Sequence, residues 1–361
     1  MKKFAIAGTV GVPGNYGGFE TLADNLVVFA KDQSLDHALT VYCSSKSYQD
    51  RPPEYQGAKL RYIPLSANGA QAILYDMWSL VDAVFRRTDT VLLLGHGGSF
   101  IIPLLRPFTR TRFITNIDGI EWRREKWSRL ASWVLRKSEA CAIRFSHEII
   151  TDNQAISEYV MSEFGKTSHV IPYGGDHALT TEPEADPALN LPDNYALSLC
   201  RIEPENNVAM ILEAFAQMPE RDLVFVGNWD KSDYGRDLKA KYSGHENLHL
   251  LDPVYHPGHL RWVRDGAHAY VHGHSAGGTN PSLVEMMHFG IPVFAHGCNF
   301  NRYTTEDRAI YFESAESLMD EVKDADEARL TENGTVMREI AQRRYTWDHV
   351  GRTYFDLMVG A

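Results

Sequence analysis

Short apolar runs, each followed by a glycine-rich loop or by a stretch with helical spacing, recur along the chain and constrain its fold more than any other feature. The first run, FAIAGTV at residues 4–10, is continuous and leads into a glycine-rich loop, which is typical of a buried parallel strand. Residues 19–31 then place Phe19, Leu22 and Leu26 at helical spacing. Because alternating strands and helices form parallel sheets covered on both faces, the pattern predicts an α/β fold.

The alternation is interrupted once, by a segment at 171–195 that concentrates proline, glycine and acidic residues, as linkers do. The strand pattern then begins again at 194–200. We therefore predict two Rossmann-like, doubly wound domains, 1–176 and 177–345, and a last helix at 346–361 that packs back on the N-terminal domain. Open parallel sheets bind ligands at the carboxyl ends of their strands, so we expect the site in a cleft that both sheets face. The other strands are predicted at 38–43, 60–65, 90–95, 112–117, 147–152, 222–227, 248–252, 269–273 and 292–297.

Composition and charge limit the class of protein. Hydrophobic residues make up 44% and charged residues 23% of the 361, which excludes a disordered chain. The net charge of −11 argues against a nucleic-acid binder. No run of about 18 apolar residues predicts a membrane span, the N-terminus lacks the apolar stretch of a signal peptide, and the four cysteines show no paired spacing. We expect a cytoplasmic protein.

The glycine-rich loop GTVGVPGNYGG is the first candidate binding element. Its last glycines, Gly17 and Gly18, lead into the predicted helix, so backbone N–H groups can approach a ligand there. A tight turn between a strand and a helix would explain two of the five glycines. The glycine spacing of three differs from the G-x-G-x-x-G of dinucleotide-binding proteins, which disfavours an NAD-dependent oxidoreductase.

Two segments of the second domain favour an anionic ligand. Arg201 directly follows a strand and offers forked donors to a phosphate, although a surface salt bridge would also explain it. In YVHGHSAGGTNPSLVEMMHFG, a strand and a glycine turn precede a helix. The amides of Gly278, Thr279 and Asn280 would point at an anion. Glu285, in the second turn of that helix, could accept hydrogen bonds from ribose hydroxyls, or could simply be solvated.

Two strands of the first domain end in polar residues that would face the cleft. His96 follows the strand at 90–95, and Asp118 and Glu121 follow the strand at 112–117. A core or capping histidine is an equally good interpretation of His96. A turn before a glycine would explain Asp118.

Together these segments resemble a known family. The strand, the glycine turn and P-x-x-x-E-x-x-x-x-G-x-P-V resemble the nucleotide-sugar site of the family 4 retaining glycosyltransferases, which have the two-domain GT-B fold. GTVGVPGNYGGFE, DGIEWRREKWS, VIPYGGD, RIEPENN and RRYTWDHV resemble, in order, one subgroup of that family. The subgroup contains bacterial rhamnosyltransferases of polysaccharide assembly.

The resemblance implies a retaining transfer of L-rhamnose from dTDP-L-rhamnose to a saccharide acceptor, expected to be lipid-linked, without a metal or other cofactor. It implies catalytic roles for His96, Asp118 and Arg201. It places the nucleotide sugar at Gly17, Gly18, Arg201, Asn206, Gly278, Thr279, Asn280 and Glu285. It places the acceptor at Tyr16, His96, Asp118 and Glu121.

Two positions depart from the family pattern. Gly277 stands where the family carries the first glutamate of a pair, and Asn206 stands where it carries a lysine. These departures keep two alternatives open: an enzyme of the same fold that uses another nucleotide sugar, and a non-catalytic partner subunit that binds sugars.

Residues 102–144 carry a local net charge of +6, and tryptophans interleave with the cations. Tryptophan among basic residues suits a lipid headgroup interface, so an anionic inner-membrane surface is a predicted partner. An amphipathic helix with core tryptophans and solvated arginines is the alternative. The residues concerned are Trp122, Arg124, Lys126, Trp127, Arg129, Trp133 and Lys137.

Overall fold

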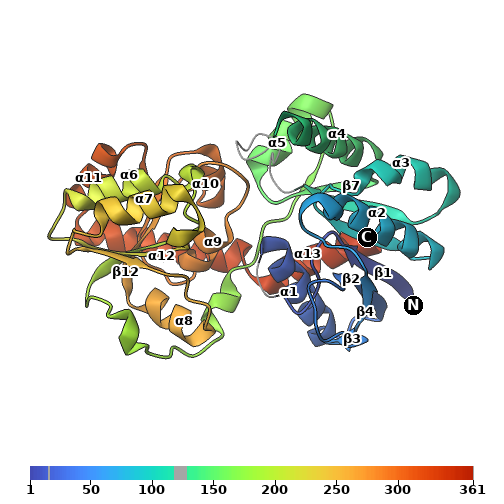
Figure 1. The fold of residues 1–361 in the computed structure, drawn as a ribbon, viewed down its shortest axis with the longest axis horizontal. Coiled ribbons are helices and arrows are strands. Elements are labelled where there is room, and N and C mark those ends of the chain that lie inside the picture. The colour runs from blue at the N-terminus through green and yellow to red at the C-terminus, as the bar shows by residue number, and fades with distance from the viewer. Residues whose placement is uncertain (15–16, 118–127, 361) are drawn as a thin grey trace. The chain divides into compact units, whose positions relative to one another are not determined.

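The computed structural model describes residues 1–14, 17–117 and 128–360. The chain divides into two compact units: the first unit comprises Met1–Pro172 with Trp347–Ala361, and the second unit comprises Tyr173–Thr346 (Figure 1). Each unit is built on a mainly parallel sheet. The predicted α/β fold with two parallel-sheet domains is therefore confirmed.

The sheet of the first unit has the strand order β3-β4-β2-β1-β5-β6-β7-β8. All its pairs are parallel except the β3–β4 hairpin. The chain winds outward from β1 in one direction and returns beside β1 with β5, which is the doubly wound order of a Rossmann fold. The strands are β1 (Lys2–Ala7), β2 (His37–Ser44), β3 (Glu54–Tyr55), β4 (Ala58–Ile63), β5 (Thr90–Leu94), β6 (Arg112–Ile117), β7 (Glu148–Thr151) and β8 (His169–Val170).

Helices cover this sheet, and their apolar residues complete its core. Tyr75 and Leu80 of one helix pack with Val91 and Leu93 of β5 in one buried cluster. This burial explains why the central strands read as continuous apolar runs. The helices are α1 (Gly18–Asp32), α2 (Ala72–Phe85), α3 (Ile102–Leu105), α4 (Arg129–Phe145), α5 (Gln154–Phe164) and α13 (Trp347–Val359).

The last helix, α13, belongs to the first unit and lies beside α1 (Figure 1). The rings of Phe29 and Phe355 stack at a centroid distance of 5.8 Å. Asn116 Nδ2 donates to the Tyr354 hydroxyl at 2.6 Å, and Thr90 Oγ1 donates to the Met358 carbonyl at 2.9 Å. These contacts fasten α13 to both α1 and the sheet.

The sheet of the second unit has the order β11-β10-β9-β12-β13-β14, and every pair is parallel. This is again the doubly wound order, with its reversal between β9 and β12. The strands are β9 (Tyr195–Leu199), β10 (Asp222–Val226), β11 (Leu248–Leu251), β12 (Ala267–His272), β13 (Val293–His296) and β14 (Ile310–Phe312).

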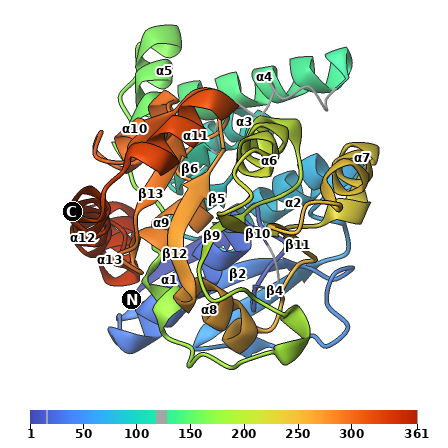
Figure 2. The same ribbon diagram turned by 90° about the vertical axis from the view of Figure 1, so that its left-hand side faces the viewer.

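One large core cluster of the second unit joins its sheet to α6 and α11, through residues such as Phe215, Phe225 and Leu318. In Figure 2, α6 and α7 lie to the right of β12 and α12 lies to its left, so helices cover both faces of the sheet. The helices are α6 (Val208–Ala216), α7 (Asp233–Tyr242), α8 (Pro257–Asp265), α9 (Pro281–Met287), α10 (Asn299–Thr304), α11 (Ala315–Asp324) and α12 (Glu327–Arg344).

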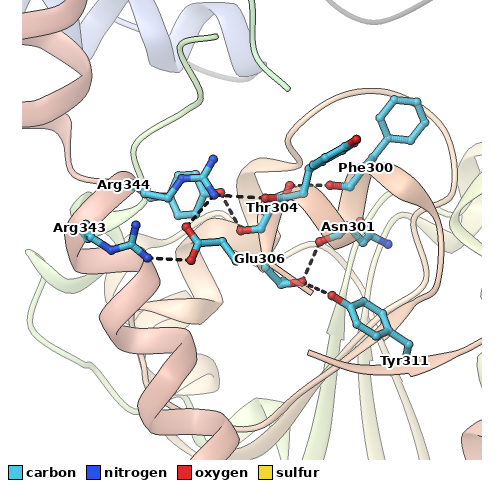
Figure 3. Close-up of polar contacts among 10 residues, drawn as sticks. Phe300, Asn301, Thr304, Glu306, Tyr311, Arg343 and Arg344 are labelled. Atoms are coloured by element: carbon cyan, nitrogen blue, oxygen red, sulfur yellow. Dashed lines mark hydrogen bonds and ion pairs between the residues drawn. The ribbon is translucent and has the colours of Figure 1, made fainter. Parts of the chain in front are cut away.

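A charged cluster holds the end of α12 against α10 (Figure 3). The Glu306 carboxylate accepts from Arg343 Nη2 at 2.7 Å and from Arg344 Nη1 at 3.0 Å. The hydrogen bond from Arg343 and the charges of both arginines lower the pKa of Glu306, and the hydrogen bond from Arg344 adds to this shift. The neighbouring Tyr345 hydroxyl donates to the Thr304 carbonyl at 2.7 Å. The C-terminal end of the second unit is therefore fixed before the chain returns to the first unit.

Candidate functional site

The topology of each sheet marks one edge as the ligand edge, because doubly wound sheets bind ligands at the carboxyl ends of the strands beside the point where the strand order reverses. In the second unit these strands are β9 and β12. The chain leaves β9 at Leu199 and β12 at His272. The residues predicted from sequence for the nucleotide sugar, other than the two glycines of the first unit, follow these strands.

The loops after β9 and β12 are locked together by hydrogen bonds. Asn206 is buried, and its Nδ2 donates to the Arg201 carbonyl at 2.6 Å. Its Oδ1 lies 2.7 Å from Nδ1 of His274 in the loop after β12. Asn207 Nδ2 donates to the Gly273 carbonyl at 2.8 Å. The sequence departure at Asn206 thus has a structural role, since its amide joins the two loops. Contact of Asn206 with a nucleotide sugar stays a prediction.

The side chain of Arg201 extends into solvent from these two hydrogen-bonded loops. Its side chain is 43% exposed, and its Nε lies 3.8 Å from Glu203 Oε2, which is a long ion pair. Such a pair contributes little to stability, so a phosphate could replace Glu203 at small cost. The geometry suits the predicted role of Arg201.

The backbone of the glycine turn before α9 explains why Gly277 stands where the family carries a glutamate. Gly277 has φ of +127°, a conformation that L side chains rarely adopt, so a glutamate there would strain this backbone. Asn280 is the N-cap of α9, and its Oδ1 accepts from Ser282 N at 3.0 Å and from Ser282 Oγ at 2.8 Å. Thr279 is buried. Contact of an anion with Gly278, Thr279 or Asn280 stays a prediction.

Glu285 is buried on α9 and faces two basic groups. One carboxylate oxygen accepts a hydrogen bond from Arg264 of α8, and Oε1 lies 3.4 Å from Nε2 of His177. Burial alone would raise the pKa of Glu285, but Arg264 and His177 outweigh it and hold this pKa below its usual range. Glu285 is therefore ionised, which suits an acceptor of hydroxyl hydrogen bonds. Sequence reasoning did not find Arg264, because basic residues are common in the last turn of any helix.

Three histidines lie at the carboxyl ends of β12 and β13. His272 and His274 have ring centroids 6.0 Å apart, and His296 ends β13. Burial, and then the charges of His274 and His296, hold the pKa of His272 well below its usual range. His272 is therefore neutral. Sequence reasoning gave these histidines no role.

In the first unit, the reversal of strand order falls between β1 and β5, and the glycine-rich loop follows β1. A side chain at Gly8 would overlap the Leu94 carbonyl, and one at Gly11 would overlap Cys43. Gly17 has φ of +126° and is the N-cap of α1, where a Cβ would overlap the Glu20 carboxylate. Packing within the unit therefore explains these glycines. Ligand contact at Gly17 and Gly18 stays a prediction.

His96 lies just beyond β5 and is buried. Its carbonyl accepts a hydrogen bond from the Ser138 hydroxyl of α4. Next to this loop, Asp76 of α2 is buried against Gly97 and Gly98. Burial raises the pKa of Asp76 to about 8, although a hydrogen bond from the backbone of Gly98 opposes the shift. Asp76 is neutral below this pH. A catalytic or acceptor-binding role for His96 stays a prediction.

Several predicted residues lie outside the described part of the chain: Tyr16, Asp118 and Glu121 of the acceptor set, and Trp122, Arg124, Lys126 and Trp127 of the basic segment. In the described part of that segment, apolar side chains are exposed, among them Leu104, Phe108, Leu130 and Trp133. Trp133 is 59% exposed, with Lys137 Nζ 6.0 Å from its ring centroid. Trp133 is therefore not the core tryptophan of the alternative interpretation. Within the described ranges, no helix is long and apolar enough to cross a membrane.

Two family models match the chain, one in each unit. Residues 181–342 match the family model "Glycosyl transferases group 1", and residues 1–176 match a domain of unknown function, DUF1972. No curated protein matches the sequence.

Solved structures resemble the whole chain. Sucrose-phosphate synthase from Thermosynechococcus elongatus has a TM-score of 0.80 at 15% identity, covering 100% of both chains. HepE of Anabaena in complex with UDP has a TM-score of 0.75 at 15% identity, again covering 100% of both. A glycosyltransferase from Rickettsia africae has a TM-score of 0.71 at 10% identity and covers 99% of this chain and 98% of its own.

Two doubly wound units of this kind, matched along their full length by such structures, define the GT-B fold. The second unit carries a group 1 glycosyltransferase domain, and the protein is a glycosyltransferase. The predictions of a GT-B fold and of a glycosyltransferase are thus confirmed.

Proposed function

We propose that this glycosyltransferase moves a sugar, with retention of configuration, from a nucleoside diphosphate sugar to a saccharide acceptor. The preferred donor is dTDP-L-rhamnose, on the strength of the subgroup resemblance. The acceptor is a lipid-linked saccharide of cell-surface polysaccharide assembly. HepE, which shares the fold, has been solved with UDP and with UDP-glucose, which supports a nucleotide sugar as the donor class.

The proposal rests on the two hydrogen-bonded loops that follow β9 and β12, where the strand order of the second unit reverses. Asn206 and His274 hold the loops together, and Arg201 extends from them half-exposed. A fixed frame with a nearly unpaired guanidinium suits a diphosphate, which arginine binds through forked donors. We assign Arg201 and the backbone of Gly278–Asn280 to the diphosphate.

Glu285 is assigned to the ribose. Its two oxygens face Arg264 and His177, so the carboxylate stays ionised and fixed in place. An ionised carboxylate accepts hydrogen bonds from vicinal hydroxyls without giving a donor in return. The contact is the same before and during sugar transfer, so it contributes to donor affinity.

The transfer needs no nucleophile from the protein. The bond between the anomeric carbon and the diphosphate oxygen breaks, the acceptor oxygen bonds to the anomeric carbon on the same face, and the acceptor proton passes to the departing phosphate oxygen. Arg201 stabilises the negative charge that grows on this oxygen, which is an electrostatic form of catalysis. His96 and Asp118 are assigned to the acceptor and the transferred sugar.

Nucleotide-sugar binding by the full-length enzyme tests the assignment. Calorimetry with dTDP-L-rhamnose, UDP-glucose and dTDP, followed by release of nucleoside diphosphate on addition of a saccharide acceptor, separates donor identity from turnover. The Arg201→Ala variant is compared with Arg236→Ala, another exposed arginine of the second unit, whose Nη1 donates to the Asp230 carbonyl.

We expect loss of turnover only for Arg201→Ala. If UDP-glucose binds tightly and dTDP-L-rhamnose does not bind, the proposal that dTDP-L-rhamnose is the donor is wrong. Binding of a nucleotide sugar without release of nucleoside diphosphate would favour the non-catalytic subunit.

The membrane-binding surface is assigned to the exposed apolar and basic side chains of α3, of the short turn Arg106–Phe108 that follows it, and of α4. Leu104, Phe108 and Trp133 can enter a lipid interface, and Arg129 and Lys137 can meet anionic headgroups. Several such cations together, at about 1 kcal/mol each, would give reversible binding to an anionic membrane.

A further inference from the structure

Two histidines and two carboxylates gather where the segment before β9 passes the start of α8, and the proposed reaction uses none of them. His256 is the N-cap of α8, and His259 lies in its first turn. Glu184 and Asp186 come from the segment before β9. We propose that this cluster binds a zinc ion through Nε2 of His256, Nε2 of His259 and the carboxylate of Glu184.

The three ligand groups already converge. Nε2 of His256 lies 3.8 Å from Oε2 of Glu184, and Nε2 of His259 lies 3.6 Å from Oε1 of the same carboxylate. The ligand atoms of the three residues all lie within 4.8 Å of one another. Zinc held at about 2.0–2.1 Å in tetrahedral geometry places neighbouring ligand atoms about 3.3 Å apart. The longest distance between the ligand atoms must therefore shorten by up to about 1.5 Å. The side chains of His256 and Glu184 are 53% and 63% exposed, so they have room to rotate toward one another.

Asp186 lies behind His259 and orients it. Its Oδ2 is 3.4 Å from Nδ1 of His259, on the opposite side of the ring from Glu184. Metal-bound histidines commonly donate their second N–H to a carboxylate, which leaves the lone pair on the nitrogen that faces the metal. Asp186 is thus a positioning residue, and His259 presents Nε2 to the cluster.

The charge of the site balances. Nδ1 of His256 accepts a long hydrogen bond from His259 N at 3.4 Å, so the ring proton is on Nε2. When Nε2 binds zinc, the proton moves to Nδ1. The hydrogen bond from His259 N is then lost, and the bond to zinc replaces it. A cation is disfavoured at the start of a helix, where the dipole is positive. The carboxylates of Glu184 and Asp186 offset the two charges of zinc, so the helix end meets a neutral site.

Hydrogen bonds to backbone carbonyls hold the segment around Glu184 against α8 before any metal binds. Glu184 N donates to the Gly258 carbonyl at 3.0 Å. Arg261 Nη1 donates to the carbonyls of Leu179 at 2.7 Å and Thr181 at 3.2 Å. The two segments that carry the ligands therefore need little ordering on binding. Two imidazoles with one carboxylate and an open position suit zinc, whereas magnesium and calcium prefer oxygen ligands alone.

The zinc site shares no residue with the proposed donor site. Zinc binding also tests it independently of nucleotide-sugar binding. Zinc would tie the segment around Glu184 to α8, whose last turn carries Arg264. The expected role is structural, because the metal would lie on a segment that no assigned step of sugar transfer uses.

Zinc titration of metal-free, full-length protein tests the proposal, by competition with a chromogenic chelator in a buffer without phosphate. We expect one zinc per chain, and visible absorption typical of a tetrahedral site when cobalt replaces zinc. His256→Gln and His259→Gln should each weaken zinc binding at least tenfold. Asp186→Asn, which keeps the side-chain oxygen that caps Ala188, should weaken it about 10–100-fold.

His245→Gln, at an exposed histidine outside the cluster, is the matched control. Melting curves recorded without zinc show that each variant is folded, which separates ligand loss from misfolding. Equal zinc affinity in the wild type and in the His256→Gln/His259→Gln double variant would overturn the proposal. So would binding of less than one zinc per chain at saturation.

Discussion

Replacement of Asp76 by asparagine should remove a pH dependence from the stability of the first unit. Asp76 is buried on α2, and burial raises its pKa to about 8. In the unfolded chain the carboxyl titrates near its ordinary value of 3.8. At a pH between 3.8 and about 8, the folded state holds one more proton than the unfolded state. The stability that this proton provides is complete below the unfolded pKa and is lost as the pH rises toward 8.

The size of the effect follows from the shift. The free energy of unfolding falls by about 1.4 kcal/mol per pH unit between the two pKa values, and by about 2 kcal/mol from pH 6 to pH 8, where the slope flattens. Asparagine resembles the protonated carboxyl and does not titrate. The stability of Asp76→Asn relative to the wild type should therefore rise by about 2 kcal/mol over this range.

Hydrogen exchange of β1 and β5 peptides, measured by mass spectrometry and corrected for intrinsic rates, reports on the first unit alone. At pH 8 relative to pH 6, exchange through global unfolding should speed up about 30-fold more in the wild type than in Asp76→Asn. Asp82, on the same helix, is the control. Despite partial burial, Arg61, Arg86 and Tyr42 lower its pKa to about 2, so Asp82→Asn should change stability equally at pH 6 and 8. Parallel pH profiles for Asp76→Asn and the wild type would refute the reasoning.

Four other outcomes test the site. Arg201→Ala should lower kcat by about 10²–10³, since one donor to the leaving group is lost, and a near-normal kcat in steady-state kinetics would remove Arg201 from the active site. Glu285→Gln should raise mainly the donor KM, whereas a fall in kcat alone would give Glu285 a chemical role. EDTA should leave sugar transfer intact, because Arg201 and backbone amides are assigned to the diphosphate; activity that magnesium or manganese restores after chelation would contradict this. Replacement of Arg129 and Lys137 by glutamate should abolish sedimentation with anionic vesicles at low salt and slow transfer to a lipid-linked acceptor more than to a soluble one. Wild-type protein that stays in the supernatant at low salt would rule out this membrane surface.

Continuous apolar runs made the central strands predictable. The predicted strand at 90–95 corresponds to Thr90–Leu94, and the predicted strand at 112–117 corresponds to Arg112–Ile117. The edge strands Glu54–Tyr55 and His169–Val170 escaped prediction, because two residues cannot form a recognisable run. Helix α12 also escaped prediction, because its buried face includes Asn333 and Gly334 and so shows no clear apolar stripe.

The candidate site was predictable where its residues come directly after the end of a predicted strand. Arg201 and the loop before Asn280 come directly after β9 and β12, so their proximity follows from the doubly wound order. Their partners were not predictable, because contacts between distant residues depend on packing. Nothing local in the sequence joins Asn206 to His274 or Glu285 to Arg264. The glycines after β1 also needed the structure, since close packing and ligand approach favour the same residue.

The return of α13 to the first unit fixes the order in which the protein can be completed during synthesis. Residues 173–346 form one contiguous unit that can fold as soon as it leaves the ribosome. The first unit must wait, because Phe355 packs against Phe29 and Met358 accepts the Thr90 hydrogen bond only after the second unit has been made. Until then, the apolar surface of α1 that α13 covers lacks its partner. The segment made first is therefore the last to reach its native state.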